Sequence, residues 1–321
     1  MGVRRPSPVT DPVTDPVTDP VSGPAADPSA QPVGVVGLGE MGLPIAANLA
    51  RAGFPVFAHD VDPLARNRAF ARGINVAANL GEIAPRAPTW LVVTPSDALS
   101  KVVENLAAAL SPSAVVVVCS SVDPGVMVAA SRVLQASGTD VCEAALARGV
   151  PAAREGSLLL YCGGRADVLE RVAPVLNTIG TDVVHVGPLG SGQAAKLLNN
   201  LLLWSNIAAV SETLRLAGAM GLDIDAVTAA LARGSGRSWA LDTWSRARPM
   251  PDVEHDLTRV LRTADELSLE FPFARAVQHV MTEVKARKAA WLAGAGVDRS
   301  MADFVRENFG SRSPRDGRKP R

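Results

Sequence analysis

The stretch that most constrains the fold is VGVVGLGEMGLPIAANL, residues 33–49. It begins with an apolar run suited to a buried strand, and Gly37, Gly39 and Gly42 follow at G-x-G-x-x-G spacing. Apolar residues then recur with the period of a helix. Such a strand, tight turn and helix lets the backbone approach a pyrophosphate, which the N–H groups at the helix start can hold. The motif therefore predicts a dinucleotide-binding unit.

The next strand-like segment, PVFAHD, ends in Asp60. An acidic residue roughly twenty positions after the glycine motif accepts hydrogen bonds from the adenosine ribose hydroxyls. A carboxylate there would repel a 2′-phosphate, and Val61 stands where an arginine could bind one. NAD is therefore predicted, and NADP stays possible because His59, Arg66 and Arg68 are close in sequence.

Strand-like and helical segments then alternate in TWLVVTPSD, SKVVENLAAAL, AVVVVCSSVDP and TDVCEAALARG. Alternation of this kind predicts a parallel, doubly wound sheet, whose ligands lie beyond the carboxyl ends of the strands. The loops at 94–97, 120–124 and 143–149 are thus expected to face the cofactor. The predicted cofactor-binding residues are Gly37, Leu38, Gly39, Glu40, Met41, Gly42, Asp60, Thr94, Pro95 and Ser120.

The predicted fold class is α/β, with an N-terminal Rossmann-type doubly wound parallel sheet followed by an all-α domain. Residues 32–187 form the predicted NAD-binding domain, and residues 188–307, which lack further strand-like runs, form a helical domain for substrate binding and oligomerisation. Residues 1–31 repeat a Val-Thr-Asp-Pro unit and are predicted to be a disordered tail, with a docking peptide as the alternative. Residues 308–321 are predicted to be a disordered basic tail.

Charge and cysteine content exclude several classes of partner. Lys and Arg together number 32, as do Asp and Glu, so the net charge of +0 gives no electrostatic footprint for nucleic acid or an anionic membrane. The three cysteines lack the paired spacing of a metal or redox site, and their odd number argues against a secreted disulfide framework. No apolar run approaches the roughly 20 residues of a membrane span. We expect a soluble, cytoplasmic protein without a metal.

A second motif is GSGQAAKLLNNLLLW, residues 190–204, in which Lys196 lies in an otherwise apolar helical segment. Lys196 and Asn200 are four residues apart and so share one face of a helix. The arrangement suits a proton-transferring lysine in a dry site. The alternative is a lysine that extends along apolar surface to solvent.

GLGEMGLPIAANLARAG resembles the cofactor signature of the β-hydroxyacid dehydrogenase family, which includes 3-hydroxyisobutyrate dehydrogenase. GSGQAAKLLNN is similar to that family's G-x-G-x-x-x-K-x-x-N-N pattern, and SSVDP to its Ser-Thr-x-x-Pro loop. The resemblance covers roughly residues 33–307. It implies hydride transfer between a nicotinamide and a small β-hydroxy acid or its semialdehyde, with Lys196 as general acid/base and Asn200 holding the substrate oxygen or the lysine. It also implies a homodimer or homotetramer assembled through the helical domain.

The expected substrate loop, EAALARG at 143–149, departs from the family's common D-A-P-V-S-G-G. Its Arg148 is similar to the arginine of the P-V-G-R-T loop of sulfolactaldehyde reductases. A guanidinium can bind a carboxylate or sulfonate through two hydrogen bonds, which predicts a small anionic substrate; a surface arginine is the alternative. The predicted substrate-binding residues are Ser120, Ser121, Arg148, Gly149 and Asn200.

Two further departures leave other functions open. The stretch HDL has His255 where the family carries the lysine of a K-D-L pattern, and the segment before it is about a dozen residues shorter than in the family. An imine reductase on the same architecture is one alternative, although those enzymes usually replace the lysine that Lys196 matches. A dinucleotide-binding protein without catalytic activity is the other.

Overall fold

The structure is a computed structural model that describes residues 31–245, 253–293, 304 and 307. Both predicted tails lie outside the described residues, apart from Gln31. The chain divides into two compact units, Met1–Gln193 and Ala194–Arg321. The sequence-based boundary at Gly187 coincides with the end of the last strand, whereas the structure groups the first turn of the following helix with the sheet.

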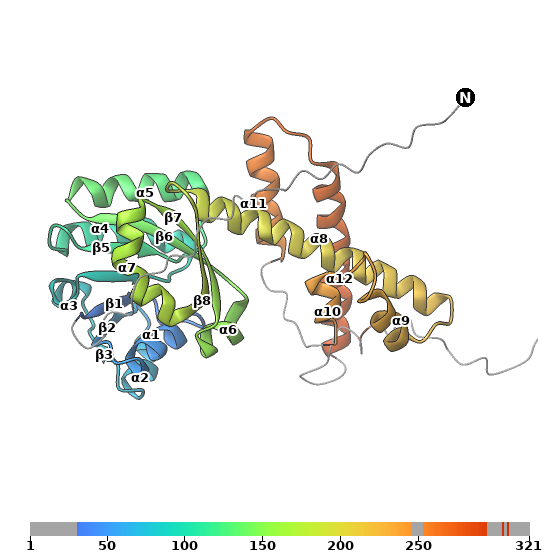
Figure 1. Ribbon diagram of the computed structural model, residues 1–321, viewed down its shortest axis with the longest axis horizontal. Coiled ribbons are helices and arrows are strands. Elements are labelled where there is room, and N and C mark those ends of the chain that lie inside the picture. The colour runs from blue at the N-terminus through green and yellow to red at the C-terminus, as the bar shows by residue number, and fades with distance from the viewer. Residues whose placement is uncertain (1–30, 246–252, 294–303, 305–306, 308–321) are drawn as a thin grey trace, which may run out of the picture. The chain divides into compact units, whose positions relative to one another are not determined.

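The first unit alternates strands and helices (Figure 1). In chain order its elements are β1 (Val33–Val36), α1 (Gly42–Arg51), β2 (Val56–His59), α2 (Pro63–Phe70), β3 (Asn75–Val76), α3 (Leu80–Ile83), the 3-10 helix η2 (Ala84–Arg86), β4 (Thr89–Val92), the 3-10 helix η3 (Ser96–Ala98), α4 (Leu99–Ala109), β5 (Val115–Val118), α5 (Pro124–Ala136), β6 (Asp140–Ala147), α6 (Gly149–Glu155), β7 (Leu158–Gly164), α7 (Ala166–Ile179) and β8 (Gly180–Gly187).

The strands form one eight-stranded sheet in the order β3-β2-β1-β4-β5-β6-β7-β8. The strands from β1 to β6 are parallel to one another, and the chain crosses from one half of the sheet to the other between β3 and β4. This confirms the predicted α/β class and the doubly wound sheet. The carboxyl ends of β2, β1, β4 and β5 are in register, with Val36 paired to both His59 and Val92, and Val92 paired to Val118.

The last two strands depart from the all-parallel sheet that the alternation predicts. β7 runs antiparallel to β6, and β8 runs parallel to β7. The connection from β6 to β7, residues 148–157, is shorter than the dozen or more residues that a parallel crossover needs, so the chain turns back. As a result β6, β7 and β8 extend the sheet beyond the carboxyl ends of its central strands, since Glu143 pairs with Val118 and β6 continues to Ala147.

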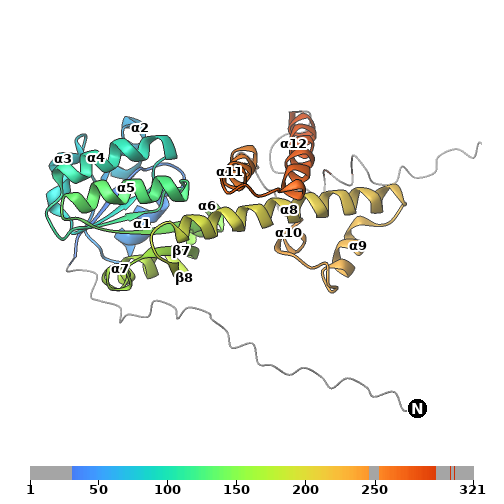
Figure 2. The same cartoon turned by 90° about the horizontal axis from the view of Figure 1, so that it is seen from above.

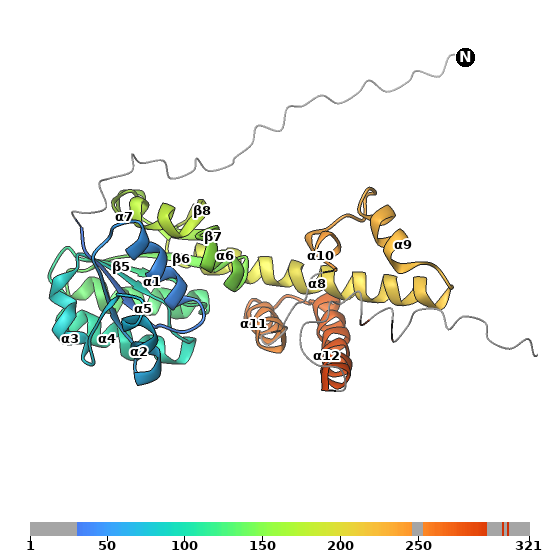
Figure 3. The ribbon, with the colours of Figure 1, turned by 90° about the horizontal axis from the view of Figure 1, so that it is seen from below.

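Two cores cover the two faces of the sheet. On one face, the side chains of α1, α6 and α7 pack against residues such as Val35 and Val117. On the other, α3, α4 and α5 pack against Trp90, Val92 and Val118. Figure 3 shows α7 and α4 on opposite sides of the strands. These buried faces explain why β1 and β5 are continuous apolar runs, as strands covered on both sides require.

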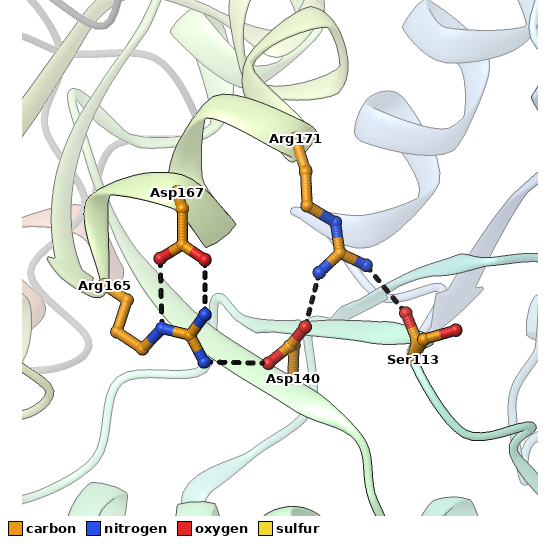
Figure 4. A network of polar contacts seen from close by, with 5 residues as sticks. All are labelled: Ser113, Asp140, Arg165, Asp167 and Arg171. Carbon is orange, nitrogen blue, oxygen red and sulfur yellow. Dashed lines mark hydrogen bonds and ion pairs between the residues drawn. The ribbon is translucent and has the colours of Figure 1, made fainter.

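A polar network joins α7 to the edge of the sheet where β5 and β6 begin (Figure 4). Asp140, the first residue of β6, accepts hydrogen bonds from Arg165 and Arg171. Arg171 also donates to the carbonyl of Ser113 at 2.7 Å, and Arg165 donates from Nε to Asp167 at 3.0 Å. The network lies at the edge opposite the carboxyl ends of the central strands, so we assign it a structural role.

Among its described residues, the second unit contains helices joined by turns and no strand, as predicted. Its elements are α8 (Ser191–Ala219), whose first residues belong to the sheet unit, α9 (Ile224–Leu231), α10 (Trp239–Asp242), α11 (Val253–Glu266) and α12 (Pro272–Ala293). α11 and α12 lie on one side of α8, and α9 and α10 on the other (Figures 2 and 3). Its core includes Trp204, Leu214, Trp244 and Met281. Within the described ranges, no helix is long and apolar enough to cross a membrane.

The packing of β1 against β4 generates a stability prediction. Gly34 lies beside the fully buried ring of Trp90, and a Cβ at residue 34 would collide with that ring. Gly34→Ala should therefore lower the free energy of unfolding by roughly 1–3 kcal/mol, measured by urea denaturation followed by circular dichroism. Gly125→Ala is the matched control, because a Cβ at residue 125 meets no atom within 4 Å. Equal midpoints for the two variants would contradict this packing.

Candidate functional site

The glycine turn after β1 has the shape of a phosphate cradle. Gly37 has φ +96°, which favours glycine, and a Cβ there would collide with the carbonyl of Val93. A Cβ at Gly42 would collide with the carbonyl of Gly37, so this glycine allows α1 to start close to the turn. Gly39 is exposed and has no atom within 4 Å of a built Cβ. Gly37 and Gly42 thus allow the backbone of the turn to pack closely, whereas Gly39 borders open space that a ligand could occupy.

Asp60 is bonded to this turn. Its Oδ2 accepts a hydrogen bond from the backbone N–H of Leu38 at 2.6 Å, and its Oδ1 accepts one from the N–H of Asp62 at 2.8 Å. Each carboxylate oxygen has a second lone pair, which remains for a ribose hydroxyl. The next residue, Val61, is 87% exposed. Arg66 donates to the carbonyl of Asp60 at 2.6 Å, so its guanidinium lies next to this residue.

The loops after β4 and β5 are bonded to each other. The N–H of Thr94 donates to Ser120 Oγ at 3.0 Å, and the two hydroxyl oxygens are 3.3 Å apart. Ser120 is buried, whereas Pro95 and Ser121 are exposed. Since β1, β2, β4 and β5 end in register, the predicted cofactor residues that follow them lie along one edge of the sheet.

The remaining predicted cofactor residues, Glu40 and Met41, are exposed and half-buried respectively, immediately before α1. An open glycine position, a helix start and a fixed carboxylate at one edge together fit a dinucleotide. Gly37 to Gly42 would hold the pyrophosphate, and Asp60 the adenosine ribose.

Residues 143–147, expected to be a loop, form the second half of β6, and Arg148 follows the last residue of that strand. It has φ +78°, and its Nη1 donates to Asp182 at 2.7 Å, to Thr181 Oγ1 at 3.0 Å and to the Ser157 carbonyl at 3.1 Å. The guanidinium lowers the pKa of Asp182 by hydrogen bonding to its carboxylate. Gly149, with φ +72°, follows as the first residue of α6. Arg148 is therefore bonded to the edge strand β8 through one of its nitrogens.

Lys196 and Asn200 lie one turn apart on α8, in the helical unit. Lys196 is half-buried and Asn200 is buried, and Asn200 Oδ1 accepts a hydrogen bond from Asn199 Nδ2 at 3.4 Å. His255 is exposed on α11. The next residue, Asp256, accepts a hydrogen bond from the indole of Trp204 at 2.9 Å, which joins α11 to α8.

Glu143 and Gln193 are two polar residues of this region that the sequence reasoning did not single out. The carboxylate of Glu143 accepts backbone hydrogen bonds from the first turn of α8, and the side chain of Gln193 bonds to the loop after β5. Burial raises the pKa of Glu143, and the backbone hydrogen bonds oppose that rise. An acidic residue within the apolar strand DVCEAALA was the available signal, because a buried charge needs partners.

Two family models cover most of the chain. Residues 32–187 match the model described as the NAD binding domain of 6-phosphogluconate dehydrogenase. Residues 190–294 match the model described as NAD-binding of NADP-dependent 3-hydroxyisobutyrate dehydrogenase.

Sequence relatives agree with these models. The chain is 32% identical over 228 residues to the mitochondrial 3-hydroxyisobutyrate dehydrogenase of Mus musculus, covering 70% of this chain and 67% of the relative. It is 32% identical over 214 residues to the 2-(hydroxymethyl)glutarate dehydrogenase of Eubacterium barkeri, covering 65% and 71%. The solved 3-hydroxyisobutyrate dehydrogenase of Mycobacterium tuberculosis with L-serine has a TM-score of 0.74 at 22% identity, covering 86% of this chain and 98% of that chain, and supports the fold.

Three observations point to the same family. They are the glycine turn with its bonded aspartate, the order of an α/β sheet unit and a helical unit, and the similarity to these relatives. The chain belongs to the β-hydroxyacid dehydrogenase family.

Proposed function

We propose that the protein transfers a hydride between NAD(P) and a small β-hydroxy acid or its semialdehyde, with Lys196 as the general acid/base. The observation that carries the proposal is the position of Lys196 on α8. The first turn of this helix is bonded to Glu143 of β6 and to the loop after β5, and Lys196 follows Gln193 by about one helical turn. Membership of a family of hydroxyacid dehydrogenases supports the reaction type.

The roles of the chain's own residues follow from their chemistry. The bound nicotinamide would supply or accept the hydride. In the direction of reduction, the Lys196 ammonium would donate a proton to the carbonyl oxygen of the substrate; in oxidation, the neutral amine would take the proton from the hydroxyl. Asn200, on the same face of α8 one turn later, would orient the substrate oxygen or the lysine.

We propose a small anionic substrate, held by Ser120, Ser121, Arg148, Gly149 and Asn200. Ser120 lies in the loop after β5, where its hydroxyl oxygen accepts a hydrogen bond from the N–H of Thr94. Arg148 engages Asp182 through Nη1, so an anion that binds this guanidinium would compete with or add to that pair. The names of the relatives, which act on 3-hydroxyisobutyrate and 2-(hydroxymethyl)glutarate, are consistent with a small hydroxy carboxylate.

We further propose that the protein is a homodimer or homotetramer assembled through the helical unit. Leu198, Leu202 and Leu216 are 56%, 64% and 63% exposed and lie within about 40° of one another around α8. Lys196 and Asn200 lie on the opposite side of that helix. A stripe of exposed leucines suits contact with a second copy. The free, buried thiols of all three cysteines support the proposal of a reducing, cytoplasmic location.

An assay of NADH oxidation distinguishes the dehydrogenase from the two other functions, an imine reductase and a non-catalytic dinucleotide-binding protein. An imine reductase would oxidise NADH with cyclic imines, not with semialdehydes. A non-catalytic protein would bind NAD(H) without turning over either class. Retention of Lys196 and Asn200 favours the dehydrogenase.

The cofactor prediction concerns Asp60. NADH should bind at least about tenfold more tightly than NADPH, a difference of about 1.4 kcal/mol, because a 2′-phosphate would meet the Asp60 carboxylate. Fluorescence titration of the purified protein measures both dissociation constants. Asp60→Ser should bring the two constants closer together, since it removes the negative charge and leaves the guanidinium of Arg66 next to residue 60. Tighter binding of NADPH by the unaltered protein would contradict the assignment.

The substrate prediction concerns Arg148 and its partner. Arg148→Ala should raise KM for an acidic substrate about tenfold or more, because it removes a charge-assisted hydrogen bond of about 1.5–3 kcal/mol. Asp182→Asn should lower KM, because it releases Arg148 from its ion pair. Neither change should alter the Kd for NADH. An unchanged KM in both variants would show that the ion pair between Arg148 and Asp182 stabilises β8 and does not bind the substrate.

The catalytic prediction concerns Lys196. Lys196→Ala should lower kcat by roughly 10²–10⁴-fold, while the Kd for NADH and the melting temperature stay unchanged. Lys196→Arg should not restore activity, because a guanidinium keeps its charge but does not release a proton near neutral pH. Steady-state kinetics with semialdehyde substrates measure both effects.

Lys101→Ala is the matched control, since Lys101 is an exposed lysine of α4 that pairs with Glu104. Near-full activity of Lys196→Arg would exclude the general-acid role. Loss of folding in Lys196→Ala would assign the lysine a structural role.

A further inference from the structure

Glu143 is a fully buried carboxylate on β6, at the level where the central strands end. Its Oε1 accepts hydrogen bonds from the backbone N–H groups of Gly190 at 2.6 Å and Gly192 at 2.9 Å. Its Oε2 accepts one from the N–H of Gln193 at 3.3 Å. The first N–H groups of a helix have no partner within the helix, and here one side chain supplies it. The negative charge also complements the positive end of the helix dipole.

Two glycines fit the space around this side chain. A Cβ at Gly163, the residue paired with Glu143 on β7, would collide with Oε1. A Cβ at Gly192 would lie 3.1 Å from the Glu143 carboxyl carbon and would also collide with the Tyr161 carbonyl. The pocket therefore accommodates a carboxylate at the reach of a glutamate. The shorter aspartate of the family's common loop would place its oxygens farther from the helix.

Gln193 provides a second connection from the same turn of α8. Its Nε2 donates to the carbonyl of Ser120 at 2.9 Å, and its Oε1 accepts from the N–H of Val122 at 3.0 Å. Gln193 is itself buried. Glu143 and Gln193 together bond the start of α8 to β6 and to the loop after β5, so the first turn of this helix cannot rotate without breaking buried hydrogen bonds.

We propose that Glu143 is a positioning residue for hydride transfer: its carboxylate fixes the first turn of α8 and thereby the orientation of Lys196, one turn later on the same helix. This inference rests on the proposed function, because it assigns Glu143 an effect on the chemistry that Lys196 performs. Glu143 touches neither substrate nor cofactor in this role. Both its charge and its length matter, since three N–H groups must be reached at once.

Two conservative variants separate these requirements. Glu143→Gln keeps the length and one carbonyl oxygen, but turns an NH₂ group toward backbone N–H donors and removes the charge. Glu143→Asp keeps the charge but shortens the side chain by one methylene, which moves the carboxylate away from the backbone N–H groups of α8. Glu143→Ala would leave buried donors unpaired and is avoided because it endangers folding. Glu170→Gln, an exposed glutamate on α7, is the matched control.

The expected result is a fall in kcat of about 10–100-fold for Glu143→Gln and a smaller fall for Glu143→Asp, because a misplacement of about 1 Å can cost 10²-fold. The Kd for NADH should not change, since the glycine turn and Asp60 are untouched. With NADH carrying deuterium at the transferred position, the primary isotope effect on kcat should rise in both variants. Rates are measured at least 10 °C below each melting temperature, so that loss of folded protein cannot imitate the effect.

A double-mutant cycle with Lys196→Ala completes the test. If Glu143 acts through Lys196, Glu143→Gln should add little to the loss already caused by Lys196→Ala. Additive losses would overturn the inference, as would variants that melt earlier but keep the unaltered protein's kcat and isotope effect. Those outcomes leave Lys196→Ala inactive and the proposed function intact. Full activity of Lys196→Ala would instead refute the proposed function, and the role of Glu143 with it.

Discussion

The start of α8 is a buried helix end, and a buried helix end must find partners for its first N–H groups. In this protein one side chain from the sheet, Glu143, supplies several of them. The carboxylate also constrains the residues around it, because Gly163 of β7 and Gly192 of α8 must lack side chains to leave room for it. The first turn of α8, which belongs to the sheet unit, is therefore held beside β6 by buried hydrogen bonds.

The two edges of the sheet carry different chemistry. At the carboxyl ends of the central strands, the loops are joined by hydrogen bonds from backbone N–H groups to side chains. Leu38 donates to Asp60 in this way, and Thr94 donates to Ser120. At the opposite edge, Asp140 is enclosed by two arginines in a network that joins α7 to β6 (Figure 4). Exposed ion pairs of this kind add little stability each, but a shared carboxylate orders two arginines together. The proposed cofactor-binding residues and the ion-pair network thus lie at opposite ends of the strands.

The sequence predicted the parts of this fold that follow from short-range patterns. Apolar runs marked β1, β4 and β5, and the glycine spacing marked a turn whose contacts the structure explains residue by residue. The reversal of β7 was not predicted, because strand direction depends on the length of the connection and leaves no trace in the apolar pattern. The partners of Arg148 were not predicted either, since Asp182 and Thr181 are distant in sequence. Glu143 was visible as an acid in an apolar strand, but its partners required the topology.

In the proposed function, Lys196 lies on one side of α8 and the exposed leucines lie on the other, so the number of residues in this helix is constrained. Each residue added to or removed from an α-helix turns everything after it by about 100°. One extra residue between Gln193 and Lys196 would leave the bonded first turn in place, yet it would swing Lys196 and Asn200 toward a flank of the helix and turn the exposed leucines away from their side. Ala194 and Ala195 can therefore be exchanged for other helix-forming residues, whereas an insertion or deletion between Gln193 and Lys196 would disturb the proposed catalysis and the proposed assembly together. Related chains should vary at these two positions and hardly at all in the number of residues between them.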